Sequence, residues 1–114
     1  MSRTPQDCFS SHGEALNAGD VPRLLEDYTE DAVLMTHDGV FEGREAIGGF
    51  FSAALSALPD AKFTFGSATF AGDALLLRWS ASSPQGRIED AVDTFVFTDG
   101  MIRLQTVSFS VAPA

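Results

Sequence analysis

The sequence is short of cysteine, histidine and basic residues, and each shortage excludes a class of protein. The 114 residues include 1 cysteine and 2 histidines, so an intramolecular disulfide cannot form and few metal ligands are available. The 7 lysines and arginines are outnumbered by 16 aspartates and glutamates, which gives a formal net charge of -9. Nucleic acids and anionic membranes both require a basic protein surface, so we expect neither as a partner.

Long apolar runs and the usual cofactor motifs are also missing. No apolar run approaches the ~20 residues that cross a bilayer, and residues 1–7 lack the apolar core of a signal peptide. The two histidines, His12 and His37, lie too far apart to suggest a metal site. There is no glycine-rich phosphate loop, no His-Glu-x-x-His and no nucleophile elbow. We therefore expect a cytoplasmic protein without a metal or cofactor.

The residues that are abundant predict one domain with a real core. The hydrophobic fraction is 45%, and the 10 phenylalanines supply much of it. Charged residues make up only 20%, so the composition does not suggest global disorder. A chain of this length fits a single domain spanning residues 1–114.

Apolar spacing predicts three helices followed by antiparallel strands. The first helix begins after Thr4 and ends at Gly19, the second runs from Asp20 through Tyr28, and the third spans residues 44–58. The predicted strands span residues 32–36, 40–42, 62–70, 74–82, 87–97 and 101–111. The resulting order, α-α-β-β-α-β-β-β-β, is that of an α+β fold.

Asp93 is the most unusual residue of the strand predicted at 87–97. Side chains alternate between the two faces of a strand, so Asp93 shares a face with Ala91, Phe95 and Phe97. Burial among apolar groups disfavours a carboxylate and raises its pKa. A protonated Asp93 could donate a hydrogen bond to a ligand oxygen.

The turn after this strand decides which side chains face Asp93. A turn of two residues would place one set on that face: Ile102, Leu104 and Thr106. A turn of three residues, with Gly100 in a bulge, would place the other set there: Arg103, Gln105, Val107 and Phe109. We favour the second arrangement, because it puts Gln105 opposite Asp93 and gives the acid a hydrogen-bond partner.

Four stretches of the chain resemble the nuclear transport factor 2-like superfamily, within it the SnoaL-like and ketosteroid-isomerase-like proteins. They are ALNAGD at 15–20, YTEDA at 28–32, FEGREAI at 41–47 and VDTFVF at 92–97. The resemblance covers nearly the whole chain. It implies a cone-shaped curved sheet wrapped round helices, a cystatin-like roll, with a pocket at the open end. It also implies a homodimer that pairs through the sheet.

The family's polar positions carry over to this chain in part. Asp93 matches the aspartic acid that precedes the Phe-x-Phe strand of ketosteroid isomerases, and His12 stands where they have a hydrogen-bonding tyrosine. Their base aspartate corresponds to Thr36, with His37 and Asp38 just beyond it. The Arg-x-Asp of the epoxide hydrolases is absent, because Arg78 is followed by Trp79 and Ser80.

Two functions are compatible with these residues. The first is an isomerase-like or polyketide-cyclase-like enzyme that acts on a small apolar carbonyl compound. Its catalytic residues would be Asp93, His12 and, as the base, Asp38 or His37 if the turn aims one of them inward. The expected ligand-binding residues are Tyr28, Thr36, Phe51, Trp79, Phe95 and Gln105. The second is a non-catalytic ligand-binding or dimerisation domain of the same fold.

Each candidate residue also has a purely structural interpretation. Asp93 could be a buried acid paired with Arg103, Gln105 or Arg78. His12 could be a hydrogen-bonded histidine of the core. Residues 37–39 form a turn in any case, because Asp and Gly suit turn geometry.

Overall fold

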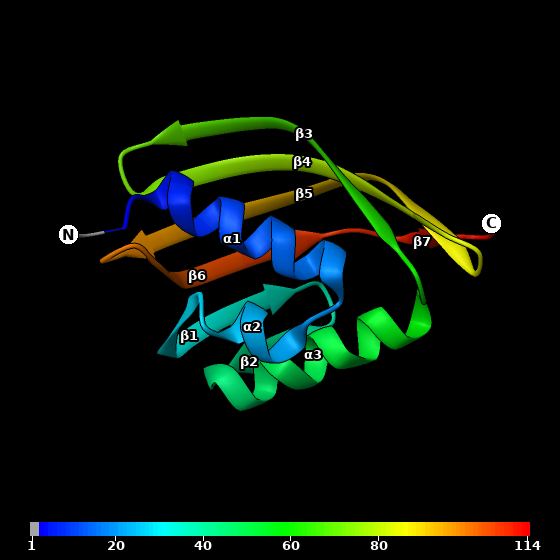
Figure 1. The fold of residues 1–114 in the computed structure, drawn as a ribbon, viewed down its shortest axis with the longest axis horizontal. Coiled ribbons are helices and arrows are strands. Elements are labelled where there is room, and N and C mark those ends of the chain that lie inside the picture. Colours follow the sequence, from blue (N-terminus) through cyan, green and yellow to red (C-terminus); the bar gives the residue numbers. More distant parts are fainter. Residues whose placement is uncertain (1–2) are drawn as a thin grey trace.

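The computed structural model describes residues 3–114 and contains three helices and seven strands within them (Figure 1). The elements are α1 (Pro5–Ala18), α2 (Val21–Leu25), β1 (Tyr28–Thr36), β2 (Gly39–Glu42), α3 (Gly43–Ala57), β3 (Lys62–Ala71), β4 (Ala74–Ser83), β5 (Gly86–Thr98), β6 (Met101–Ser108) and β7 (Val111–Ala112). Helices and a run of strands are segregated along the chain, which confirms the α+β class.

All seven strands belong to one curved sheet. Its order is β2-β1-β6-β5-β4-β3, and β7 pairs with β5 beside this path. The pairs are antiparallel except β1 with β6, which is parallel, so the sheet is mixed. Figure 1 shows the sheet curving round α1, with α2 and α3 beside it. The concave face and the helices enclose the core.

Helix α1 has well-formed ends, as the sequence predicts. The Thr4 hydroxyl accepts a hydrogen bond from the Asp7 amide at 3.1 Å, and the Asp7 carboxylate accepts from the Thr4 amide at 3.0 Å. At the other end Gly19 adopts φ 66°, a left-handed conformation that glycine reaches without a steric penalty. This helix presents Cys8, His12 and Leu16 to the core.

The second helix is shorter than predicted. It ends at Leu25, and Tyr28 is the first residue of β1 rather than the last of α2. The spacing of Tyr28 from Leu24 and Leu25 predicts a buried residue of a helix. Tyr28 is indeed buried, but as the first inward-facing residue of a strand. The backbone carbonyl of Asp27 accepts a hydrogen bond from the Ile102 amide at 2.7 Å, which ties the chain to β6 before β1 begins.

The turn between β5 and β6 is shorter than predicted, but Gln105 still faces inward as expected. Asp99 (φ 52°) and Gly100 (φ 74°) both lie in the left-handed region, as a two-residue type I′ turn requires. Phe97 pairs with Ile102, yet Val96 pairs with Leu104. The extra residue that forms the bulge is therefore Arg103, which is exposed.

Beyond this bulge the predicted inner face of β6 is confirmed for Gln105 and Val107, which are both buried. Arg103 was predicted on that face and lies on the other. The long last strand is also divided in two: β6 ends at Ser108, and the separate β7 pairs with the start of β5.

Candidate active-site cavity

The concave side of the sheet and α3 enclose a cavity of about 650 Å³. Its wall is mostly phenylalanine, leucine and alanine, with only four polar side chains: His12, Trp79, Asp93 and Gln105. The small residues of α3, among them Ala46, Gly49 and Ala53, leave the space that bulkier side chains would fill. An apolar cavity with a few convergent polar groups is the usual form of a small-molecule site.

Asp93 is held by two neutral donors. The Trp79 indole N–H donates to Oδ1 at 2.8 Å, and the Gln105 amide donates to Oδ2 at 2.8 Å. The carboxyl group is 4% exposed, and this burial raises its pKa to about 6, although both hydrogen bonds act to lower it. No salt bridge to Asp93 exists among the described residues. Asp93 is therefore mostly ionised at pH 7 and can accept a proton.

Tyr28 fixes the orientation of Gln105. The fully buried Tyr28 hydroxyl donates to Gln105 Oε1, so the amide nitrogen of Gln105 is the group that faces Asp93. In the sheet Gln105 pairs with Phe95 and Val107 pairs with Asp93, so Gln105 reaches the acid diagonally. The predicted hydrogen bond between Gln105 and Asp93 is confirmed, and Tyr28 extends it into a chain of three side chains.

His12 lines the same cavity from α1 and is 2% exposed. Burial lowers its pKa to about 4, so the ring is neutral at pH 7. Its Nδ1 has no hydrogen-bond partner among the described residues. The rings of Tyr28, Phe51 and Phe95 contact it edge-on, with centroids 5.4–6.2 Å away. A hydrogen-bonded core histidine, the structural alternative, would have a partner at this nitrogen.

Of the expected ligand-binding residues, three line the cavity and two pack behind those that do. Phe51, Trp79 and Gln105 line the cavity. Tyr28 and Phe95 lie behind the lining: Tyr28 holds Gln105, and Phe95 packs against His12. Phe109, which the sequence predicts on the face of Asp93, lines the cavity as well. Phe63 is the lining residue that the sequence did not single out, although alternation along the strand predicted at 62–70 could have found it. The ring centroids of Phe63 and Phe109 lie 5.6 and 6.2 Å from that of Trp79.

Thr36 and Asp38 do not belong to the cavity. The Thr36 hydroxyl accepts a hydrogen bond from the Asp38 amide at 3.0 Å and so closes the turn between β1 and β2. The Asp38 side chain is 83% exposed and lies 3.4 Å from His37 Nε2, which is itself on the surface. The prediction that this turn aims a base inward is wrong, because a tight turn at the sheet edge points its side chains to solvent.

The described residues 3–114 contain no cluster of His, Cys, Asp and Glu that could hold a metal ion. Within the same residues no helix is long and apolar enough to cross a membrane. Cys8 is fully buried, and burial raises the pKa of its thiol to about 12, which leaves it a poor nucleophile. The chemistry of the cavity therefore depends on its four polar side chains.

Residues 11–105 match the SnoaL-like domain, so the chain belongs to that family. This confirms the superfamily that the sequence resembles. No curated protein sequence is similar enough to count as a match.

Solved structures of low sequence identity share the fold. SalBIII, described as an epoxide hydrolase/cyclase-like enzyme in pyran ring formation in salinomycin, has a TM-score of 0.83 and 22% identity, over 96% of this chain and 95% of that one. IdmH of Streptomyces antibioticus, a candidate polyketide cyclase, has a TM-score of 0.82 and 19% identity, over 95% and 93%. An NTF2-like protein of unknown function from Cytophaga hutchinsonii has a TM-score of 0.80 and 18% identity, over 96% and 93%. These similarities establish the fold, and the cavity must supply the argument for function.

Proposed function

We propose that the protein is an enzyme of the isomerase or cyclase type that moves a proton on a small apolar carbonyl compound. The observation that carries this proposal is Asp93, the only carboxylate among the described residues that line the cavity, with a pKa of about 6. General bases work best when their pKa lies near the working pH. This assignment replaces the role of neutral donor expected for Asp93 from the sequence.

In this mechanism the ionised Asp93 removes a proton from the carbon next to the carbonyl group. The C–H electron pair moves into the new enolate, and the negative charge collects on the carbonyl oxygen. Trp79 and Gln105 hold the carboxylate in place before and after the transfer. Asp93 then returns the proton to another carbon. Alternatively, the enolate carbon attacks a second carbonyl carbon of the same molecule and closes a ring, while the π electron pair of that carbonyl moves onto its oxygen, which takes the proton back from Asp93.

His12 supplies the hydrogen bond to the oxyanion. A neutral imidazole carries one N–H. The buried Nδ1 has no hydrogen-bond partner among the described residues, so a proton on Nδ1 would be a buried donor without an acceptor. The proton is better placed on Nε2, because Nδ1 is then only an unpaired acceptor. A neutral donor in an apolar cavity stabilises a developing negative charge strongly, and loss of one such donor typically costs on the order of 10²–10³ in rate.

The test uses hydrogen–deuterium exchange of 2-tetralone, an apolar bicyclic ketone, followed by NMR in D₂O. The exchange measures proton removal next to a carbonyl without knowledge of the natural substrate. We expect the protein to accelerate it and Asp93→Asn to reduce the catalysed rate by on the order of 10²–10⁴. The matched control is Asp90→Asn, which removes an exposed acid of the same strand that does not line the cavity.

The second candidate function is a non-catalytic ligand-binding domain. One observation favours it: both oxygens of Asp93 already accept a hydrogen bond within the protein. This function predicts that 2-tetralone binds, as measured by calorimetry, but that its exchange rate stays at the buffer value. Exchange that is catalysed equally well by Asp93→Asn would contradict the proposed role of Asp93.

We also propose that the protein forms a homodimer through the outer face of the sheet. Strand register aligns one row of uncharged side chains across that face: Val40, Met35, Thr106, Thr94, Leu76 and Thr69. Val40 is 59% exposed and Leu76 is 51% exposed. In a chain with a net charge of -9, such a row favours contact with a second copy over contact with water.

A further inference from the structure

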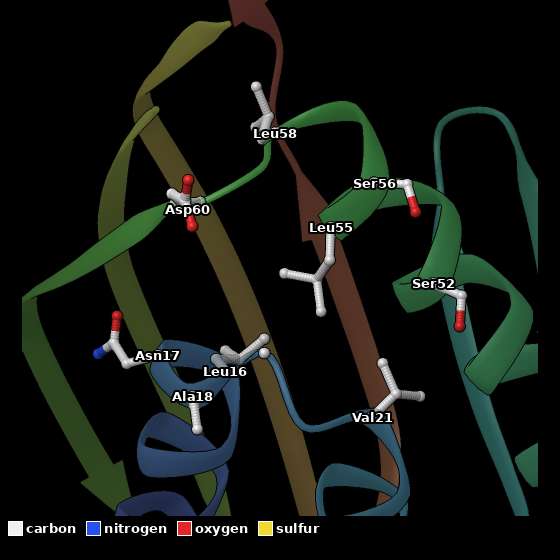
Figure 2. A pocket seen from close by; sticks show the side chains of 11 residues that line it. Leu16, Asn17, Ala18, Val21, Ser52, Leu55, Ser56, Leu58 and Asp60 are labelled. Carbon is white, nitrogen blue, oxygen red and sulfur yellow. The ribbon is translucent and has the colours of Figure 1, made fainter. Parts of the chain in front are cut away.

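A second hollow of about 390 Å³ lies on the surface next to the cavity. Its side chains come from the end of α1, from Val21 at the start of α2, from the second half of α3 and from the turn that follows α3 (Figure 2). We refer to this hollow as the outer groove. Unlike the cavity, it has several polar side chains, namely Asn17, Ser52, Ser56 and Asp60.

Three leucines belong to the walls of both the cavity and the outer groove: Leu16, Leu55 and Leu58. Figure 2 shows Leu16 and Leu55 extending into the space between α1 and α3. Leu16 is 8% exposed and Leu58 is 7% exposed, whereas Leu55 is only partly buried. The cavity and the outer groove therefore adjoin at these three side chains.

Beyond Glu45, α3 has polar side chains only at the outer groove. From Ala46 to Leu58 the helix and its cap read AIGGFFSAALSAL, so Ser52 and Ser56 are the only polar side chains in this stretch. They are one helical turn apart and both line the outer groove. The hydroxyls can donate and accept, which suits the hydroxyl groups of a ligand.

Asp60 restricts the charge of the group that the outer groove can bind. It lies in the turn after α3 with φ 57°, and its exposed side chain lines the outer groove. A carboxylate accepts hydrogen bonds from hydroxyl groups and repels an anion. The fourth polar residue, Asn17, is already bonded to the backbone of Phe63. The outer groove is therefore suited to a group that carries hydroxyls and no negative charge.

We infer that the ligand is amphipathic, with an apolar ring system in the cavity and an uncharged hydroxylated end in the outer groove. This inference rests on the proposed function of the cavity and names the class of compound that it takes. The end in the groove takes no part in proton transfer, but its hydrogen bonds orient the rings relative to Asp93.

Calorimetry with a matched pair of compounds tests this inference: 2-naphthol, which resembles the enol of 2-tetralone, and 2-naphthyl β-D-glucopyranoside. We expect the glucoside to bind more tightly than the naphthol. In the double variant Ser52→Ala/Ser56→Ala its Kd should rise about three- to tenfold for each hydroxyl removed, while the Kd of 2-naphthol stays the same. Both changes raise helix propensity, so folding is retained.

Ser10→Ala is the control, because Ser10 is an exposed serine of α1 that does not line the outer groove. The corresponding glucuronide should bind more weakly than the glucoside, and Asp60→Asn should narrow that difference. If 2-naphthol binds but the glucoside has no advantage, or keeps it in the double variant, the inference is wrong and the proposed function stands. If neither compound binds, both are wrong.

Discussion

At the scale of single residues, the hydrogen bonds of Asp93 determine both its protonation and its orientation. Two neutral donors bind the carboxylate without an ion pair. Their hydrogen bonds offset only part of the rise in pKa that burial causes, so the pKa of Asp93 stays near 6. A carboxylate paired with Arg would have a pKa well below this value and would be a weak base. Among the described residues that line the cavity there is no cation beside Asp93, and this keeps the carboxylate basic enough to accept a proton.

The first prediction concerns the pH dependence of stability. The pKa of Asp93 is raised from 3.8 in the unfolded chain to about 6, so the folded state holds its proton more tightly between these values. The contribution of Asp93 to the free energy of unfolding must therefore fall as the pH rises from 3.8 to about 6, by up to about 3 kcal/mol. Above this window the contribution stays constant.

Urea unfolding of the wild type and Asp93→Asn at pH 4, 5, 6 and 7.5 measures this effect. We expect the wild type to lose stability relative to Asp93→Asn as pH rises to 6. His12, whose pKa is lowered, contributes with the opposite sign in both proteins and cancels in the comparison. Asp90→Asn should run parallel to the wild type. Parallel curves for Asp93→Asn would show that the pKa of Asp93 is normal.

The second prediction concerns Tyr28, which acts on Asp93 through Gln105. Tyr28→Phe keeps the ring but leaves Gln105 Oε1 buried without a donor, which costs about 1–3 kcal/mol of stability. The Gln105 amide can then rotate so that its oxygen faces Asp93 and accepts a hydrogen bond from the protonated acid. We expect the pKa of Asp93 to rise further, as followed by ¹³C NMR of its carboxyl carbon. A lower or unchanged pKa would contradict this role.

The sequence could predict Asp93 but not its whole environment. Alternation along one strand places Asp93 among apolar neighbours, and this local rule needs no tertiary information. Tyr28 and Gln105 come from β1 and β6, which pair in parallel although β1 lies early in the chain. A parallel pairing of distant strands leaves no local signal, so their hydrogen bond could not be predicted.

At the scale of secondary structure, Asn17 connects α1 to the edge strand β3. Its side-chain oxygen accepts a hydrogen bond from the Phe63 amide at 2.8 Å, and its amide nitrogen donates to the Phe63 carbonyl at 3.4 Å. The side chain thus takes the place of a neighbouring strand at this edge. Because α1 carries His12, this connection helps to set the distance between His12 and the sheet.

The third prediction follows from this connection. Asn17→Ala should lower the free energy of unfolding by about 1 kcal/mol, since the bonds that it removes are exposed. It should also accelerate hydrogen exchange of the Phe63 amide, which NMR detects directly. Ser10→Ala, in the same helix, should leave that amide unchanged. Unchanged exchange at Phe63 in Asn17→Ala would mean that another group protects this amide.

The hairpin of β5 and β6 shows why element boundaries are harder to predict than element types. Asp99 and Gly100 suit both a two-residue and a three-residue turn, and only the paired strand decides between them. The turn is one residue shorter than predicted, but the bulge at Arg103 adds one residue to β6, so Gln105 still faces inward. The apolar pattern fixed which side chains are buried, and the backbone adjusted by one residue to satisfy it.

At the scale of the whole molecule, the two faces of the sheet have different roles. The inner face carries the cavity, and the outer face carries the uncharged row that includes Met35, Thr94, Thr106 and Leu76. Specific, stable protein interfaces bury roughly 800 Å² per partner. A dimer formed through the outer face of the sheet would leave α3 and the outer groove accessible.

The last prediction tests the dimer without disturbing the cavity. Thr94 lies at the centre of the uncharged row, and its side chain points away from Asp93 because adjacent residues of a strand face opposite sides. Thr94→Arg would bring two like charges together near the two-fold axis of the dimer.

Light scattering coupled to gel filtration should give twice the chain mass for the wild type and the chain mass for Thr94→Arg. The control is Ser10→Arg, an exposed change on α1 away from the outer face of the sheet, which should stay dimeric. Exchange of 2-tetralone should be catalysed equally by all three proteins, because Asp93 and His12 belong to one chain and face inward. A wild type that is monomeric, or a Thr94→Arg variant that stays dimeric, would show that the outer face of the sheet is not the interface.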